Sequence, residues 1–134
     1  MRLLLDTSTC IEILRGKQAT VLARYAGCAR ADIALSAVVR AELLAGALLS
    51  AKPEENRRVA ESFCALFPCL PFDAQAADIH AQWHVRLRRA GQSIGANDLI
   101  IAATALAHGL TVVTHNLGEF QRIDGLLVED WHAG

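Results

Sequence analysis

The sequence predicts an α/β domain in which helices cover a mostly parallel sheet. At 134 residues the chain fits one hydrophobic core, and with 53% hydrophobic and 20% charged residues it has the composition of a globular protein. Aromatic residues make up only 5%, so Ala, Leu, Ile and Val must form the core. Short apolar runs alternate with segments of helical periodicity, and strands separated by helices favour parallel pairing.

The first half of the chain begins with three consecutive leucines, which indicate a buried strand that ends at Asp6. Thr9 and Glu12 have the capping-box spacing that starts a helix, and Gly16 ends it. Ser36 begins a later helix with apolar residues at helical spacing. The elements expected here are a strand at residues 2–5, helices at 9–16 and 18–26, a strand at 33–35 and a helix from residue 36.

The second half shows the same alternation of strands and helices. Pro53 suits the first turn of a helix, and Gly91 ends a longer one. Residues 111–114 are all β-branched, which favours a strand. The elements expected here are a helix at 53–67, a strand at 70–72, helices at 74–90 and 98–107, and strands at 111–114 and 126–128.

The apolar segments are too short to predict export or a membrane span. The run from Leu99 to Ala107 falls far short of the roughly 20 residues that cross a bilayer. The N-terminal leucines fall short of the about 7–15 apolar residues of a secretory signal. We therefore expect a cytoplasmic protein with no membrane contact. Its four cysteines are then expected to be reduced thiols in or near the core: Cys10, Cys28, Cys64 and Cys69.

Acidic residues far apart in the sequence stand near the ends of predicted strands. Asp6 ends the first strand, Asp98 opens a helix, and residues 116–119 follow the strand at 111–114. Ligands of open parallel sheets gather beyond the carboxyl ends of the strands, so these groups are expected to converge. Glu42 lies in an otherwise apolar helical stretch, where a carboxylate needs an arginine or a metal as its partner.

Each of these acids alone also has a purely structural interpretation. Asp6 is equally suited to capping the next helix, and Asp98 is a favourable charge at a helix N-terminus. Residues 116–118 alone are typical of a turn. Several acids that converge without a cation repel one another, whereas hard divalent cations bind oxygen ligands. The cluster as a whole therefore favours a metal site.

Five segments, in order along almost the whole chain, resemble the motifs of PIN domains. The second has the pattern S-x5-E-L-x2-G, and the last has the ending G-L-x-(hydrophobic)-E-D-W. The segments are Leu3–Thr7, Ser36–Gly46, Ile94–Asp98 together with Ile101–Ala103, Val113–Phe120 and Gly125–Trp131. Within this family the chain most resembles the VapC toxins of bacterial type II toxin–antitoxin pairs.

This resemblance implies a fold, an activity and partners. The fold is a PIN-like three-layer α/β/α sandwich with a mostly parallel central sheet, formed by residues 1–134 as a single PIN domain. The activity is that of an endoribonuclease toxin that depends on Mg²⁺ or Mn²⁺, with RNA, for instance tRNA, as its substrate. The implied partners are a VapB-type antitoxin, which inhibits the enzyme, and a second copy of the chain in a homodimer.

Carried over by position, the resemblance makes Asp6, Glu42 and Asp98 catalytic acids, with Asp6 and Asp98 as the metal ligands. Asn116 stands where the family often has an aspartate. Glu119, one turn further on, is the expected substitute and the fourth catalytic acid, although the choice between Asn116 and Glu119 stays open.

Further residues are expected to assist these acids. Thr7, Thr114 and Asn116 are expected to support the site through hydrogen bonds. The net charge of −1 provides no global attraction to nucleic acid, but eleven of the 13 basic residues are arginine, which binds phosphate through two parallel hydrogen bonds. Arg86 and Arg89 precede the central acidic motif and are candidates for contacting the RNA backbone.

The main alternative is a catalytically silent PIN-like module that binds RNA or a protein, because Asn116 replaces an acid. A phosphatase or receiver domain with Asp6 as phosphoryl acceptor is disfavoured, because the chain lacks the second aspartate of a D-x-D start.

Overall fold

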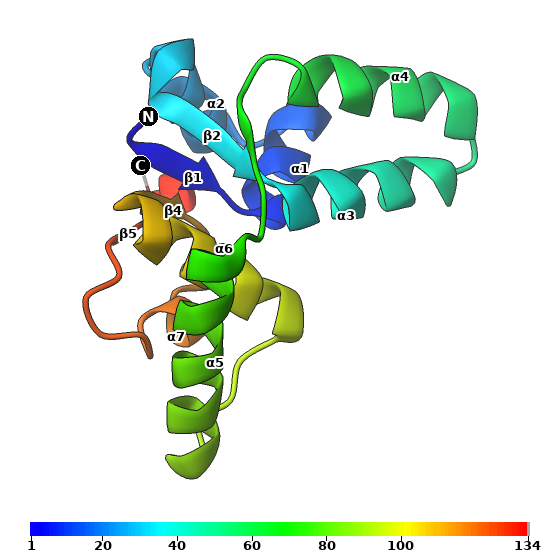
Figure 1. The fold of residues 1–134 in the computed structure, drawn as a ribbon. Coiled ribbons are helices and arrows are strands. Elements are labelled where there is room, and N and C mark those ends of the chain that lie inside the picture. The colour runs from blue at the N-terminus through cyan, green and yellow to red at the C-terminus, as the bar shows by residue number, and fades with distance from the viewer. Residues whose placement is uncertain (134) are drawn as a thin grey trace.

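Five parallel strands form one sheet at the centre of the computed structural model, which describes residues 1–133 (Figure 1). Their order across the sheet is β3-β2-β1-β4-β5, and every pairing is parallel. This confirms the α/β class and the parallel sheet. The strands are β1 (Leu3–Leu5), β2 (Ile33–Ser36), β3 (Cys69–Leu70), β4 (Thr111–Val113) and β5 (Val128–Glu129).

Helices connect the strands, and the pair α3–α4 extends to one side of the sheet while α5 extends below it in Figure 1. The α-helices are α1 (Thr7–Arg15), α2 (Ala19–Ala26), α3 (Ala37–Leu48), α4 (Pro53–Cys64), α5 (Ala74–Arg89), α6 (Ala96–His108) and α7 (Leu117–Phe120). Two short 3₁₀ turns, η1 (Arg30–Asp32) and η2 (Trp131–Ala133), precede β2 and follow β5.

The central strand β1 shows that both faces of the sheet are covered. Leu3, Leu4 and Leu5 are all fully buried. Because successive residues of a strand point to opposite faces, full burial of consecutive leucines requires packing on each face. The arrangement agrees with the three-layer sandwich that the resemblance implies.

The strand order places a switch point at the centre of the sheet. From β1 the chain moves outward through β2 to β3, and then returns across the sheet to β4 on the other side of β1. Ligands of open α/β sheets bind beyond the carboxyl ends of strands at such a reversal. A ligand site is therefore expected among the residues that follow β1 and β4.

Some predicted element boundaries are wrong. The capping box at Thr9 and Glu12 does not start the first helix, because Asp6 is its N-cap and accepts a hydrogen bond from the Thr9 backbone N–H. The segment expected as a turn, residues 116–118, overlaps the short helix α7, in which Phe120 is fully buried. Expected elements that end elsewhere are the helix at 53–67, which stops at Cys64, and the strands at 70–72 and 126–128, found at 69–70 and 128–129.

The cysteines are free thiols at several depths. Cys10 and Cys64 are buried and Cys28 is partly buried, whereas Cys69 is exposed, so the expectation that all four lie in or near the core is wrong for Cys69. Among the helices of residues 1–133, none has the length and apolar character needed to cross a membrane.

Candidate active site

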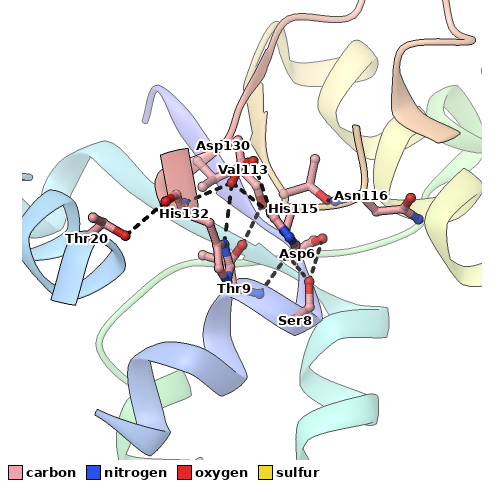
Figure 2. A network of polar contacts seen from close by, with 10 residues as sticks. Asp6, Ser8, Thr9, Thr20, Val113, His115, Asn116, Asp130 and His132 are labelled. Carbon is pink, nitrogen blue, oxygen red and sulfur yellow. Dashed lines mark hydrogen bonds and ion pairs between the residues drawn. The ribbon is translucent and has the colours of Figure 1, made fainter. Parts of the chain in front are cut away.

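Asp6 lies directly after β1 and is 4% exposed. Its backbone N–H donates to the Val113 carbonyl of β4, which ties it to the neighbouring strand. Its carboxylate accepts hydrogen bonds from the Thr9 N–H at 2.9 Å and from the Ser8 hydroxyl at 3.2 Å to either oxygen, as Figure 2 shows. Asp6 is thus the N-cap of α1. Because a carboxylate has about four lone-pair positions, Asp6 can also accept a further ligand as one of the site acids.

Glu42 projects from α3 and is partly buried. The Thr7 hydroxyl donates a 2.7 Å hydrogen bond to Glu42 Oε1. The sequence suggested an arginine or a metal as the partner of this carboxylate, but the structure provides a neutral hydroxyl from the first residue of α1. This bond holds Glu42 near Asp6 without neutralising its charge.

Asp98, Asn116 and Glu119 meet between the first turn of α6 and helix α7. The Asn116 amide donates to Glu119 Oε2 at 2.9 Å and, more weakly, to Asp98 Oδ2 at 3.4 Å. The Gly95 backbone N–H donates to Glu119 Oε1 at 3.3 Å. The Thr114 hydroxyl accepts from the Asn116 backbone N–H at 2.9 Å, so Thr114 holds the backbone of the residue whose side-chain amide joins the two acids.

The electrostatics of these acids show that they share one site. Burial is the main cause that raises the pKa of Asp98 from 3.8 to about 7, and a hydrogen bond to Glu119 adds to it. The negative charges of Glu119, Asp6 and Glu42 raise that pKa further. The pKa of Glu119 is lowered, chiefly by its hydrogen bond with Asp98. The other three predicted acids therefore all act on Asp98, whose carboxyl is about half protonated near neutral pH.

The donor set fits a hard divalent cation that keeps part of its water shell. The four acids offer only oxygen ligands, which Mg²⁺ and Mn²⁺ prefer. Among residues 1–133, these acids do not form a trio whose ligand oxygens all lie within 4.8 Å of one another. Mg²⁺ is usually held by one or two carboxylates and several waters, so its binding does not require such a trio.

The raised pKa of Asp98 predicts how pH affects stability when divalent cations are removed. A carboxyl whose folded-state pKa exceeds its unfolded value contributes stability below the unfolded value, near 4, and loses it as pH rises through about 7. We therefore expect a pH-dependent difference in urea unfolding with a chelator present. The free energy of unfolding of the wild type, minus that of Asp98→Asn, should fall as the pH rises from 4 to 8. The exposed Asp78→Asn variant should keep the wild-type pH dependence. Parallel curves for the wild type and Asp98→Asn would contradict the assignment.

Arg86 and Arg89 lie on the exposed face of the last turns of α5. The Arg86 guanidinium is 3.3 Å from Asp124 and lies 4.6 Å from the centre of the Trp83 ring. Arg86 is thus already engaged by an acid and an aromatic ring, and its role as an RNA contact stays a prediction, as does that of Arg89.

Sequence reasoning missed several groups near this edge of the sheet. The Ser8 hydroxyl and the Gly95 N–H hold two of the acids, and no pattern in the sequence pointed to them. It also missed the cluster of His115, Asp130 and His132. A usable signal existed, because His115 and Asp130 follow neighbouring parallel strands whose carboxyl ends share one edge.

Comparison with known proteins agrees with this architecture. The PIN domain family model matches residues 3–126. The chain is 37% identical over 131 residues to the tRNA(fMet)-specific endonuclease VapC of Salmonella typhimurium, which covers 98% of both proteins. It superposes on a chain of the DNA-bound VapBC structure from Salmonella typhimurium with a TM-score of 0.91 and 37% identity, covering 98% of each chain.

A second solved structure, a VapBC complex from Rickettsia felis bound to a DNA fragment from its promoter, gives a TM-score of 0.89 at 32% identity. That match covers 98% of this chain and 99% of the other. In both comparisons the similarity in sequence and in structure extends over nearly the full length of the two chains. The chain therefore belongs to the PIN domain family, within its VapC branch.

Proposed function

We propose that this protein is a metal-dependent endoribonuclease of the VapC type that hydrolyses RNA phosphodiester bonds. The observation that carries the proposal is the meeting of Asp6, Glu42, Asp98 and Glu119 at the switch point, where burial and then the other three acids raise the pKa of Asp98 to about 7. A pocket of mutually repelling carboxylates is costly unless a cation neutralises it. The full-length likeness to proteins named ribonucleases supports the same activity.

Each acid has a distinct task in this proposal. Asp6 and Asp98 hold a Mg²⁺ or Mn²⁺ ion, directly or through water, and Glu42 and Glu119 complete the negative pocket. When bound, the ion lowers the pKa of a water and neutralises charge that develops on the phosphoryl group. The Thr9 N–H fixes Asp6, and the Thr7 hydroxyl fixes Glu42.

The alternative of a silent module is disfavoured by the position of Glu119. Asn116 replaces an acid, but its amide donates to Glu119 and Asp98 together. It thereby holds Glu119 beside Asp98, so the count of carboxylates at the site is restored by the residue one turn further on. We infer that Glu119 is the fourth catalytic group and Asn116 its positioning residue.

The substrate we propose is RNA, with tRNA as the first candidate, because relatives at 37% identity are named tRNA(fMet)-specific endonucleases. The substrate is proposed to enter this site as a loop or an unstacked segment of RNA. A-form helices hide their base edges, so specific cleavage requires such a segment. Arg86 and Arg89 are proposed to contact the RNA backbone.

We further propose that a VapB-type antitoxin neutralises the enzyme, as the likeness to chains of VapBC complexes suggests. A groove between α1, α3 and α4 is lined by apolar side chains that include Leu14 and Val59, both exposed, and it reaches Glu42. An antitoxin segment seated in this groove would end beside the acids and block the substrate.

The proposed setting is the cytoplasm, with the chain as a homodimer. Free thiols at all four cysteines suit a reducing compartment, and RNA is available there. Sedimentation of the isolated chain measures whether two copies associate.

Removal of divalent cations tests the proposed activity. The purified chain, incubated with bacterial tRNA and Mg²⁺, is expected to produce discrete fragments on a denaturing gel. A chelator should abolish the fragments because it removes the cation that the acids hold. Excess Mg²⁺ or Mn²⁺ should restore the fragments. Cleavage that persists in the chelator would refute metal dependence, and an intact tRNA pool under every condition would favour the silent module.

A further inference from the structure

A second cluster of ligating side chains lies at the carboxyl edge of β4 and β5. His115 follows β4 by two residues, Asp130 directly follows β5, and His132 lies in η2. Val113 pairs in register with Glu129, so the two strands end together and bring these residues to one place. Figure 2 shows His115 and His132 close to Asp130, and each ring has its Nδ1 within 3.4 Å of an oxygen of the Asp130 carboxylate.

The two histidines present the same ring nitrogen to one carboxylate. His115 Nδ1 lies 3.1 Å from Asp130 Oδ2 and 3.3 Å from Oδ1, and His132 Nδ1 lies 3.4 Å from Oδ1. One ligand atom from each of the three residues lies within 4.8 Å of the other two. The rings are 4.1 Å apart between centroids, at an interplanar angle of 32°.

These separations match the spacing of ligands around a tetrahedral zinc ion. With Zn–N and Zn–O distances of about 2.0–2.2 Å, neighbouring ligand atoms of a tetrahedron lie about 3.3–3.6 Å apart. The observed nitrogen–oxygen distances of 3.1–3.4 Å need little adjustment to reach that range. Two imidazoles and one carboxylate are a ligand set that suits Zn²⁺, whereas Mg²⁺ prefers oxygen alone.

The hydrogen bonding of the cluster leaves one nitrogen without a partner. His132 Nδ1 is buried and makes no hydrogen bond, although it lies at ion-pair distance from Asp130. The backbone N–H of His132 already donates to Asp130 Oδ1 at 2.9 Å, which orients the carboxylate. A buried nitrogen that faces a carboxylate without a hydrogen bond is the arrangement that a bound cation would satisfy.

We propose that His115, Asp130 and His132 form a binding site for Zn²⁺, separate in residues and in ligand chemistry from the four acids. The histidines bind through Nδ1, the carboxylate supplies the third ligand, and water takes the fourth position, because His115 is exposed. When the ion binds, His115 gives up the Nδ1 proton that bonds Asp130 and carries its one ring proton on Nε2, which faces solvent, so the imidazole binds as a neutral ligand. The site joins the C-terminal turn η2 to the segment between β4 and α7, and it does not depend on the proposed nuclease activity.

Competition with a chromophoric zinc indicator, in excess Mg²⁺ to occupy the acids, tests the site. The wild type is expected to bind one Zn²⁺ with micromolar or tighter affinity. His115→Ala and His132→Ala should each weaken that affinity by tenfold or more, because even partners of ligands change metal affinity by about 10–100-fold. Histidine ¹⁵N shifts should move on zinc addition at residues 115 and 132.

The control is the His80→Ala/His84→Ala double variant. These histidines lie four residues apart on α5, with stacked rings 6.1 Å apart, and offer an alternative zinc pair that, within residues 1–133, belongs to no trio of possible ligands. The control should bind zinc as the wild type does. The proposal is overturned if the wild type binds no zinc below millimolar concentration, if His115→Ala and His132→Ala bind as tightly as the wild type, or if only the control loses binding. Circular dichroism of each variant confirms that it is folded.

Discussion

Replacing Asp98 with asparagine is expected to reduce RNA cleavage by about a hundredfold or more while the chain stays folded, which is the scale of losing one group that stabilises developing charge. Asparagine has the size of aspartate and keeps an oxygen that can accept from the Asn116 amide. It removes the charge that would hold a cation. The measurement is the initial rate of tRNA cleavage at saturating Mg²⁺.

The fold of the Asp98→Asn protein should be at least as stable as the wild type at pH 8. The wild-type carboxylate at that pH is surrounded by the charges of Glu119, Asp6 and Glu42, which oppose its ionisation. Asp78→Asn, on the exposed surface of α5, is the matched control and should cleave at the wild-type rate. If Asp98→Asn cleaves RNA at a rate within about threefold of the control, Asp98 takes no part in catalysis, and a binding role remains for the domain.

The sheet and its helices were predictable because their signals are local. Three consecutive leucines and a β-branched run at 111–114 favour buried strands, and parallel pairing follows from the helices between them. The N-cap of α1 was not predictable in the same way, since Asp6 and Thr9 are both good caps and lie three residues apart. Packing of the sheet decided between them, because Asp6 is held to β4 through its backbone N–H.

The acids of the site were predictable as a group, but their connections were not. The positions of Asp6 and Asp98 follow from strand ends and helix starts. That Thr7 would bond Glu42 depends on how α1 packs against α3, which the sequence does not encode locally. The histidine cluster could not be predicted locally for the same reason: His115 and His132 are far apart in the sequence and meet only because β4 and β5 pair.

Substitutions at Asp6 are expected to separate its two roles, because the residue both caps α1 and faces the acids. Asp6→Asn should abolish cleavage to the same extent as Asp98→Asn, yet keep the cap, since asparagine is as good an N-cap as aspartate. Asp6→Ala should abolish cleavage and also lose about 1 kcal/mol of stability. That loss corresponds to a fall of about 3–5 °C in Tm for a domain of this size.

Asp73→Ala is the matched control, because Asp73 caps α5 through the same bond, from the Ala76 N–H at 3.0 Å, and is not among the acids of the site. It should lower Tm by a similar amount and leave cleavage intact. Loss of activity that followed Tm across the three variants, with Asp73→Ala as inactive as Asp6→Ala, would reduce Asp6 to a helix cap. Loss of cleavage in Asp6→Asn at unchanged Tm requires instead that its charge, and not its hydrogen bond to Thr9, is what the reaction uses.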